Sequence, residues 1–193
     1  MQFVRAFIAV DLAPAIHQKL DLISRQFKDQ LKGVPIKWVD IANMHLTLKF
    51  LGQVSIVNLD LVKDVIQAEA KAFSPFSLQV RGVGAFPSTK RARVLWVGVT
   101  APGELAALQR RIDEETRRLG YPSEERPFSP HLTLGRVSKD CTRADLSRIY
   151  DTLANSEVDF LGETTVDSIR LYRSDLKPGG AVYSVLYSAS LQS

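Results

Sequence analysis

Apolar and polar residues follow two different periods along the chain. Short runs of continuous or alternating apolar residues are typical of strands, whereas apolar residues that recur every three or four positions are typical of helices. The pattern predicts strands over 3–10, 36–39, 45–51, 76–84, 94–99, 131–136, 157–162, 166–173 and 181–189. It predicts helices over 14–30, 58–73, 103–119 and 142–154. This mixture of strands and helices indicates an α+β fold.

Residues that favour caps and turns mark several of these boundaries. Gly52 is expected to end the strand over 45–51, and Asn58 and Thr142 are plausible N-caps of the helices that begin there. The segment 177–180, Lys-Pro-Gly-Gly, lies between two predicted strands and no helix follows it. We therefore interpret it as a hairpin turn and not as a phosphate-binding loop.

One four-residue motif, His-Leu-Thr-Leu, occurs twice, at 45–48 and at 131–134. The chain has three histidines, so two of them begin the same motif. The composition of the chain makes a chance recurrence improbable, on the order of one in a million. The third histidine, His17, lies between polar residues on the predicted helix 14–30, and we expect it at the surface.

The spacing within the motif has a chemical consequence. In a strand, residues i and i+2 point to the same face. Each motif therefore directs one imidazole and one hydroxyl to one face and two leucines into a core. Because histidine titrates near neutral pH, one of His45 and His131 can act as general acid while the other acts as general base. The hydroxyls of Thr47 and Thr133 can donate to a charged oxygen between them.

The motifs also allow two other interpretations. A His-x-Thr pair can be an ordinary half-buried strand face, since threonine favours strands. The recurrence of the pair argues against that. A metal site would need further Cys, Asp or Glu ligands at suitable spacing, which the motifs lack. We therefore expect neither a metal nor another cofactor.

The two motifs belong to halves of the chain that match in kind. AFIAVDLAP is followed by a helix, a loop and the first motif, and VLWVGVTAP by a helix, a loop and the second motif. We interpret this as an internal duplication, with repeats near 3–75 and 94–155, inside a single two-lobed domain, 1–193. A pseudo-twofold arrangement of the two lobes would place the motif strands opposite each other across a cleft.

Composition places the chain among ordinary globular proteins. Of its 193 residues, 45% are hydrophobic and 24% are charged, a balance that supports a sizeable core. The single cysteine, Cys141, excludes an internal disulfide framework and is expected to be a free thiol. The apolar run 7–10 ends at Asp11 and is too short for a signal peptide or a membrane span. We therefore expect a cytoplasmic protein.

The net charge is +4 and the pI about 9.3. Basic residues form three groups: Lys90, Arg91 and Arg93; Arg110, Arg111, Arg117 and Arg118; and Arg136, Lys139 and Arg143. On a helix such residues often form only a solvated face. Close to an active cleft they would favour a polyanion such as RNA. Arg136 is near the second motif and is therefore a candidate site residue.

At these residues the sequence resembles the two-histidine phosphoesterase superfamily, and within it the bacterial RNA 2′,3′-cyclic phosphodiesterases, long called 2′-5′ RNA ligases. The resemblance covers nearly the whole chain. It is carried by RAFIAVDL, NMHLTLKFLG, GAFPSTKRARVLWVGV and RPFSPHLTLGR, and by Ser174 and Leu176 before the last strand.

The resemblance implies a bilobal fold with a cleft between two antiparallel sheets, and no metal. It implies that His45 is the proton donor to the leaving oxygen and that His131 is the proton acceptor that activates water. Thr47 and Thr133 would bind the phosphate oxygens. Apart from the resemblance, the position of Arg136 near the second motif makes it a candidate for contact with the RNA backbone or a phosphate.

The implied reaction converts RNA 2′,3′-cyclic phosphate ends to 2′-phosphomonoesters, and its reverse joins RNA through a 2′-5′ linkage. The implied partners are such RNA ends or small cyclic nucleotides. We expect a monomer with no membrane and no protein partner. Three alternatives remain open: a phosphodiesterase for a small molecule such as an ADP-ribose cyclic phosphate, a non-catalytic RNA-binding module, and a metal-dependent hydrolase.

Overall fold

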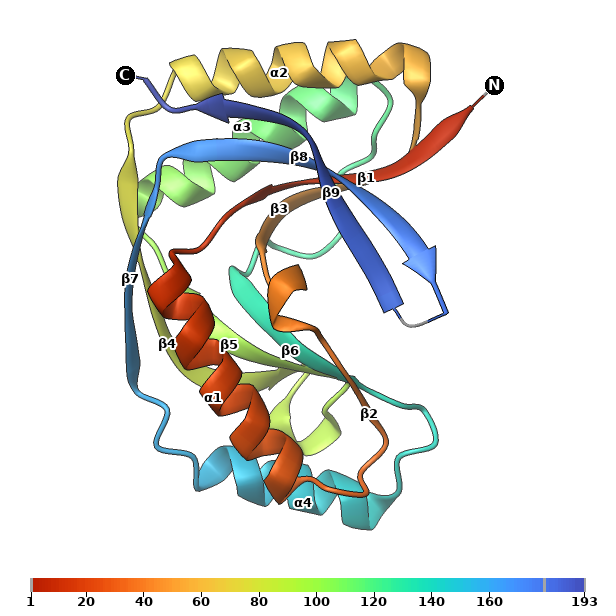
Figure 1. Cartoon of the computed structure of the whole chain (residues 1–193), viewed down its shortest axis with the longest axis vertical. Helices are drawn as coiled ribbons and strands as arrows, with labels where there is room; N and C mark the ends of the chain where they lie inside the picture. Colours follow the sequence, from red (N-terminus) through yellow and green to blue (C-terminus); the bar gives the residue numbers. More distant parts are fainter. Residues whose placement is uncertain (1, 179, 193) are drawn as a thin grey trace.

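The computed structural model describes residues 2–178 and 180–192. Its strands and helices build two lobes, one above the other in Figure 1. The elements are β1 (Phe3–Val10), α1 (Pro14–Gln30), β2 (Ile36–Trp38), η1 (Ile41–Asn43), β3 (Leu46–Ser55), η2 (Ile56–Asn58), α2 (Leu59–Lys71), β4 (Phe76–Phe86), η3 (Thr89–Arg91), β5 (Val94–Thr100), α3 (Gly103–Arg118), β6 (His131–Val137), α4 (Arg143–Ala154), β7 (Phe160–Val166), β8 (Ser168–Lys177) and β9 (Gly180–Ser190), where η marks a short 3₁₀ helix.

Two antiparallel sheets form the two lobes, which confirms the predicted fold class. The first sheet has the order β3-β1-β8-β9 and the second the order β2-β6-β5-β4-β7. Apart from β2, the two orders correspond position by position, with β3 matched to β6 and β1 matched to β5. Each half of the chain gives two strands to the sheet of the other half: β2 and β4 join the second sheet, and β8 and β9 join the first.

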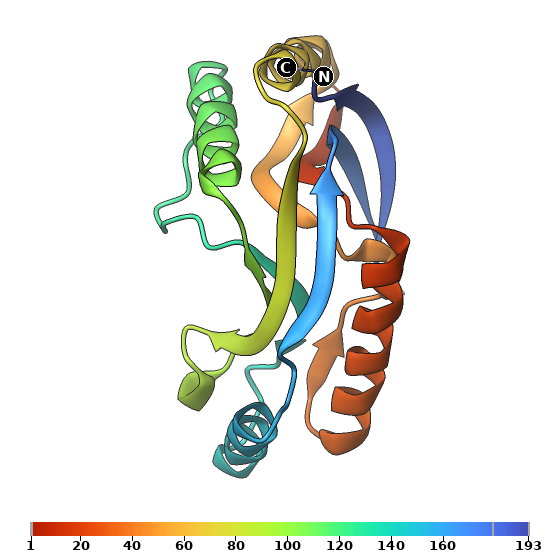
Figure 2. The same cartoon turned by 90° about the vertical axis from the view of Figure 1, so that its left-hand side faces the viewer.

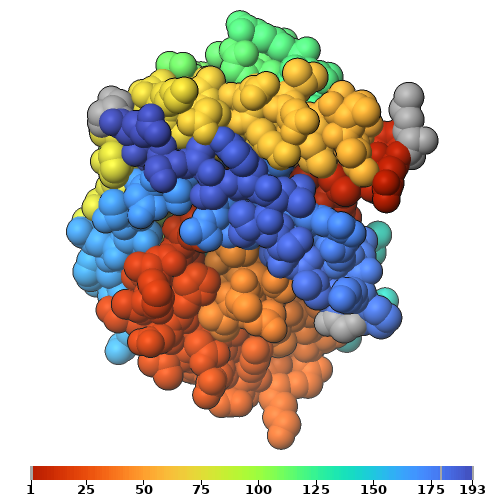
Figure 3. Space-filling model, turned by 45° about the horizontal axis from the view of Figure 1, so that its top comes forward, coloured from red at the N-terminus to blue at the C-terminus, as the bar shows by residue number. Residues whose placement is uncertain are grey.

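The helices cover the outer surfaces of the lobes. The helices α2 and α3 pack against each other and against the first sheet, whereas α1 packs beside β7 of the second sheet. The helices α1 and α3 are thus also exchanged, since α1 precedes the first motif and α3 precedes the second. Figure 2 shows α1 and α4 along the second lobe and α2 and α3 on the first. In Figure 3, the C-terminal strands cross the surface between α2 and α1.

The core follows from the alternation within the strands. Leu46 and Leu48 of the first motif are buried, as are Leu132 and Leu134 of the second. These leucines belong to one hydrophobic cluster that extends through both lobes. Burying a leucine contributes about 1.5–3 kcal/mol, so the motifs anchor their strands as well as presenting polar side chains. None of the helices in the described chain is long and apolar enough to span a membrane.

The strand that carries the first motif is longer than the sequence pattern predicted. Gly52 was expected to end it, but β3 continues to Ser55. The backbone of Gly52 has φ of +70°, and the pairing with β1 shifts register next to its partner Ala6. Gly52 thus forms an irregularity inside a paired strand, where glycine accepts a conformation that other residues resist.

Of the two predicted helix caps, one is confirmed and one is wrong. Thr142 caps α4 through a capping box, in which its hydroxyl accepts from the Asp145 amide and the Asp145 carboxylate accepts from the Thr142 amide. Asn58 caps nothing through its side chain, because its own backbone is already helical and η2 leads directly into α2. The second predicted helix is accordingly shorter, Leu59–Lys71 instead of 58–73.

The C-terminal part of the chain forms the three predicted strands with shifted ends. The strand predicted over 157–162 is β7, which begins at Phe160, and the last two strands are β8 and β9. These two pair in an antiparallel register that ends at Lys177 and Gly180, as expected for a hairpin. The predicted turn over 177–180 includes Gly179, which lies outside the described residues.

The capping box of α4 gives a prediction for stability. Thr142→Ala removes the side-chain acceptor of the Asp145 amide and should lower the free energy of unfolding by about 1 kcal/mol, measured by urea denaturation. Ser147→Ala, at an exposed position in the middle of the same helix, is the matched control. It should cause no destabilisation, because alanine favours a helix interior. Equal destabilisation by both substitutions would contradict the capping role.

Candidate active site

The five residues singled out from the sequence line one cleft between the two lobes. The cleft has a volume of about 880 Å³, and its lining includes His45, Thr47, His131, Thr133 and Arg136. The imidazoles and hydroxyls of both motifs are half-buried, and Arg136 is exposed. Strand alternation thus directs the polar pair of each motif toward a shared space while the leucines fill the core.

His45 lies against a cluster of polar and aromatic side chains on the first sheet. Its Nδ1 atom is buried and lies 3.4 Å from Oδ1 of Asp11, which follows β1 directly. The ring of Tyr172, on β8, stacks on the imidazole with 4.4 Å between ring centroids. The Tyr172 hydroxyl donates to Asp11 at 2.5 Å, and Arg170 forms an ion pair with the same carboxylate.

These contacts determine the charge of the cluster. Burial acts to raise the pKa of Asp11, but the contact with His45, the Tyr172 hydroxyl and the nearby guanidinium outweigh it and hold this pKa below its usual value. Burial, together with the hydrogen bond to the carboxylate, raises the pKa of Tyr172. The tyrosine therefore stays protonated as a donor, and Asp11 stays anionic.

An anionic carboxylate beside one ring nitrogen stabilises the protonated form of an imidazole. In His45 the nitrogen facing Asp11 is Nδ1, which leaves Nε2 for the cleft. The stacked Tyr172 ring limits rotation of the imidazole. When protonated, His45 can therefore donate a proton from Nε2 to a group in the cleft.

His131 has a different partner. Its Nδ1 atom lies 2.7 Å from the backbone carbonyl oxygen of Ser129, and its ring contacts Phe86 edge-on at 4.9 Å between centroids. A carbonyl oxygen only accepts hydrogen bonds, so Nδ1 carries the proton of the neutral imidazole. Nε2 of His131 then has a free lone pair and can accept a proton from a group in the cleft.

An irregularity in β3 brings an aromatic residue into the cleft. The pairing of β1 and β3 shifts register between the partners of Ile8 and Ala9, so Leu48 and Lys49 are both buried. The alternation then resumes in the opposite phase, and Phe50 lies 51% exposed in the cleft lining. Strict alternation from His45 would have pointed Phe50 away from the cleft, so the sequence pattern alone did not identify it.

An ion pair between a buried lysine and a half-buried aspartate joins the first motif strand to the segment before the second motif. The ammonium group of Lys49 is 2.5 Å from Asp113 of α3 and 2.6 Å from the carbonyl oxygen of Pro122, and its side chain is 1% exposed. Ser123 donates to the other oxygen of Asp113 at 2.5 Å. Residues 124 and 126–129, which come next, line the cleft. The ion pair therefore fixes the loop that forms one cleft wall.

His17 differs from its prediction. The sequence placed it at the surface of the first helix, whereas it is half-buried and its Nδ1 lies 3.2 Å from the carbonyl oxygen of Ile41. This contact joins α1 to η1, the turn that leads to His45. Cys141 is a free thiol, as expected.

A metal ion would need several ligating side chains gathered in one place. Within residues 2–178 and 180–192, no three His, Cys, Asp or Glu side chains gather in this way. The cluster around His45 combines one carboxylate with a guanidinium and a phenol. That donor set stabilises a carboxylate and does not suit a cation.

Solved structures of similar fold define the class of this protein. A crystal structure from Thermus thermophilus matches with a TM-score of 0.79 and 28% identity, covering 97% of each chain. A crystal structure of E. coli LigT complexed with 3′-AMP matches with a TM-score of 0.77 and 25% identity, covering 100% of each chain. Fold and paired histidine motifs together define a two-histidine phosphoesterase.

The chain belongs to the LigT like Phosphoesterase family, which matches it twice, over residues 10–96 and 97–183. An RNA 2′,3′-cyclic phosphodiesterase from Methanothermobacter thermautotrophicus is 38% identical over 94% of this chain and 95% of the relative. One from Thermotoga maritima is 32% identical over 98% of this chain and 96% of the relative. The family resemblance stated from the sequence is confirmed.

The Lys49 ion pair gives a second prediction for stability. Lys49→Met leaves Asp113 without its partner and should lower the free energy of unfolding by about 3 kcal/mol, measured by urea denaturation. Lys63→Met is the matched control, because the Lys63–Asp60 pair is exposed on α2 and is expected to contribute less than about 0.5 kcal/mol.

The Lys49–Asp113 ion pair also predicts how the free energy of unfolding depends on pH. Burial acts to raise the pKa of Asp113, but hydrogen bonds from Lys49 and Ser123 outweigh it, so the pKa is lowered. The stabilisation is therefore complete above the ordinary Asp pKa of about 3.9 and is lost as the pH falls through the lowered value. If the difference in free energy of unfolding between wild type and Lys49→Met stays the same in acid, this assignment is contradicted.

Proposed function

We propose that this protein hydrolyses RNA 2′,3′-cyclic phosphate ends to 2′-phosphomonoesters by two-histidine acid–base catalysis that needs no metal ion. The observation that carries the proposal is the difference between the two imidazoles of one cleft. His45 faces the Asp11 carboxylate and His131 faces a backbone carbonyl. The names of the relatives support the choice of substrate.

The proposed reaction begins at His131. Its Nε2 accepts a proton from a water molecule, and the water oxygen forms a bond to phosphorus. The bond from phosphorus to the 3′-oxygen breaks, and His45 donates its Nε2 proton to that oxygen. The product keeps the phosphate on the 2′-oxygen, and each imidazole ends in the protonation state opposite to its initial one.

The remaining cleft residues bind the phosphate and the RNA. The hydroxyls of Thr47 and Thr133 donate to the non-bridging oxygens, where negative charge increases in the transition state. Arg136 is exposed in the cleft lining and contacts a neighbouring phosphate of the RNA. Phe50 offers an exposed ring on which a base can stack.

The proposal extends to the organisation of the protein. We regard 1–193 as one two-lobed domain made by duplication, with repeats near 3–75 and 94–155, that acts as a monomer in the cytoplasm. The same geometry operating in reverse, with a 5′-hydroxyl in place of water, would join two RNA ends through a 2′-5′ linkage.

Substitution of either histidine tests the catalytic roles. His45→Ala and His131→Ala should each lower kcat on an RNA with a 2′,3′-cyclic phosphate end by roughly 10²–10⁴-fold, the usual contribution of a general acid or base. His17→Ala, outside the cleft, is the control and should retain activity. The assay is product analysis in the presence of a chelator, and the product should be the 2′-phosphate.

Three outcomes of that assay would contradict the proposal. An intact cyclic end after incubation with wild type would remove the substrate assignment. A 3′-phosphate product would show that the 2′-oxygen, and not the 3′-oxygen, is the leaving group. Loss of wild-type activity upon chelation would favour a metal-dependent hydrolase.

Substitution of Asp11 tests whether this carboxylate assists His45 in the proposed reaction. Asp11→Asn removes the negative charge beside Nδ1, so kcat should fall by about tenfold, part of what a general acid supplies. KM should change much less than kcat, because Asp11 contacts His45 but is not among the residues that line the cleft. Asp175→Asn removes a carboxylate of an exposed ion pair with Arg173 and serves as the control. A rise in KM as large as the fall in kcat would assign Asp11 a purely structural role.

A further inference from the structure

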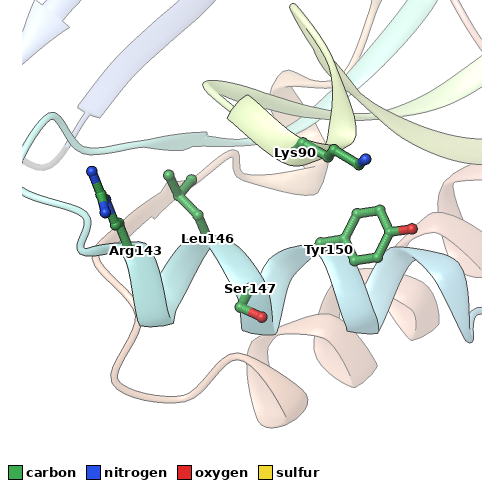
Figure 4. A pocket seen from close by; sticks show the side chains of 5 residues that line it. All are labelled: Lys90, Arg143, Leu146, Ser147 and Tyr150. Atoms are coloured by element: carbon green, nitrogen blue, oxygen red, sulfur yellow. The ribbon is translucent and has the colours of Figure 1, made fainter.

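A second hollow lies on the lobe that carries His131, between η3 and α4 (Figure 4). Its volume is about 270 Å³, and it is lined by Lys90, Arg143, Leu146, Ser147 and Tyr150. The four lining residues of α4 are spaced i, i+3, i+4 and i+7, so they share one face of the helix. Lys90 comes from η3 on the opposite wall, and Figure 4 shows its side chain above Tyr150.

The hollow is positively charged. Lys90 and Arg143 are exposed, and neither forms a salt bridge within the part of the chain that the structure describes. The nearby carboxylate of Asp140 accepts a hydrogen bond from Ser138, and that of Asp145 is used in the capping box of α4. These carboxylates therefore leave the two cations available to an anionic ligand.

The hollow also contains an aromatic ring that is not part of the hydrophobic core. The buried residues of α4 are Ile149 and Leu153, whereas Tyr150 is 39% exposed. A free aromatic ring beside lysine and arginine is the combination with which proteins bind single-stranded nucleic acid, through stacking on bases and contact with phosphates.

Both walls of the hollow come from segments that follow cleft-lining residues closely in the sequence. Residues 86–87 line the cleft, and Lys90 follows three positions later. On the other wall Arg136 lines the cleft, and the chain then reaches Arg143 through a short connection. Arg93 donates to the carbonyl oxygen of Ser138 in that connection and adds an exposed cation beside it. A strand of RNA could therefore pass from the cleft to the hollow along basic residues.

We propose that the hollow is a second nucleotide-binding subsite, which takes a nucleotide upstream of the cyclic phosphate held between His45 and His131. Lys90 and Arg143 contact its phosphate, and Tyr150 stacks on its base. This inference rests on the proposed function. The volume lies just below the ~300–1,000 Å³ of pockets for free small ligands and fits one unit of a longer chain. The subsite makes an oligoribonucleotide a better substrate than a mononucleotide.

The double substitution Lys90→Ala/Arg143→Ala tests the subsite on two substrates. On a hexaribonucleotide with a 2′,3′-cyclic phosphate end, kcat/KM should fall about tenfold or more. The slope of log affinity for this RNA against log salt concentration should become less steep by about 1.4, which is ~0.7 for each of the two lost phosphate contacts. On a nucleoside 2′,3′-cyclic phosphate, kcat/KM should not change. Tyr150→Ala should lower kcat/KM about fivefold or more on the hexamer alone, as expected for one lost stacking contact, and Tyr150→Phe should restore it.

The matched control is Lys71→Ala/Arg110→Ala, which removes the same charge from exposed positions on α2 and α3 of the other lobe. Equal losses on both substrates, or a loss no larger than that of the control, would overturn the subsite. If wild type cleaves neither substrate, the proposed function fails. Binding of a hexamer with a 3′-phosphate, measured by fluorescence anisotropy, then decides the subsite separately. Equal affinities of wild type and the Lys90→Ala/Arg143→Ala variant would overturn it.

Discussion

The two-residue period of a strand is the constraint on which the site depends. It requires the leucines of each His-Leu-Thr-Leu motif to face one way and the imidazole and hydroxyl to face the other. Because Leu46, Leu48, Leu132 and Leu134 are all buried, neither strand can slip by one residue without moving two leucines out of the core and the histidine and threonine of its motif into it. Packing free energy of the core thus holds the geometry of the cleft.

The fold is nearly symmetric, but the chemistry is not. Apart from β2, the two sheets correspond strand by strand, and each takes two strands from the other half of the chain. The two imidazoles nevertheless have different partners: a carboxylate that accepts from Tyr172 for His45, and a carbonyl oxygen for His131. The two motifs therefore occupy equivalent positions, and the different residues around them support our proposal that one imidazole donates a proton and the other accepts one.

The features that could be predicted from the sequence are those that depend on neighbouring residues. The repeated motif, the α+β class and the Thr142 cap each depend on residues close together in the chain. The features that the sequence pattern missed depend on long-range contacts or backbone irregularities. Asp11 meets Tyr172 across 161 positions, and Lys49 meets Asp113 across 64. The register shift in β3 turns Phe50 toward the cleft, and the pairing with β1 carries the strand past Gly52. Such pairings arise only when the sheets assemble.

The assignment of His45 as acid and His131 as base is tested most directly with a leaving group that needs no proton. In an RNA end whose cyclic phosphate has sulfur in place of the bridging 3′-oxygen, the departing thiolate is stable without protonation. The His45→Ala variant should then approach the wild-type rate on this substrate, while His131→Ala should remain as impaired as on the oxygen substrate. Rescue of His131→Ala, or of neither variant, would contradict the assignment.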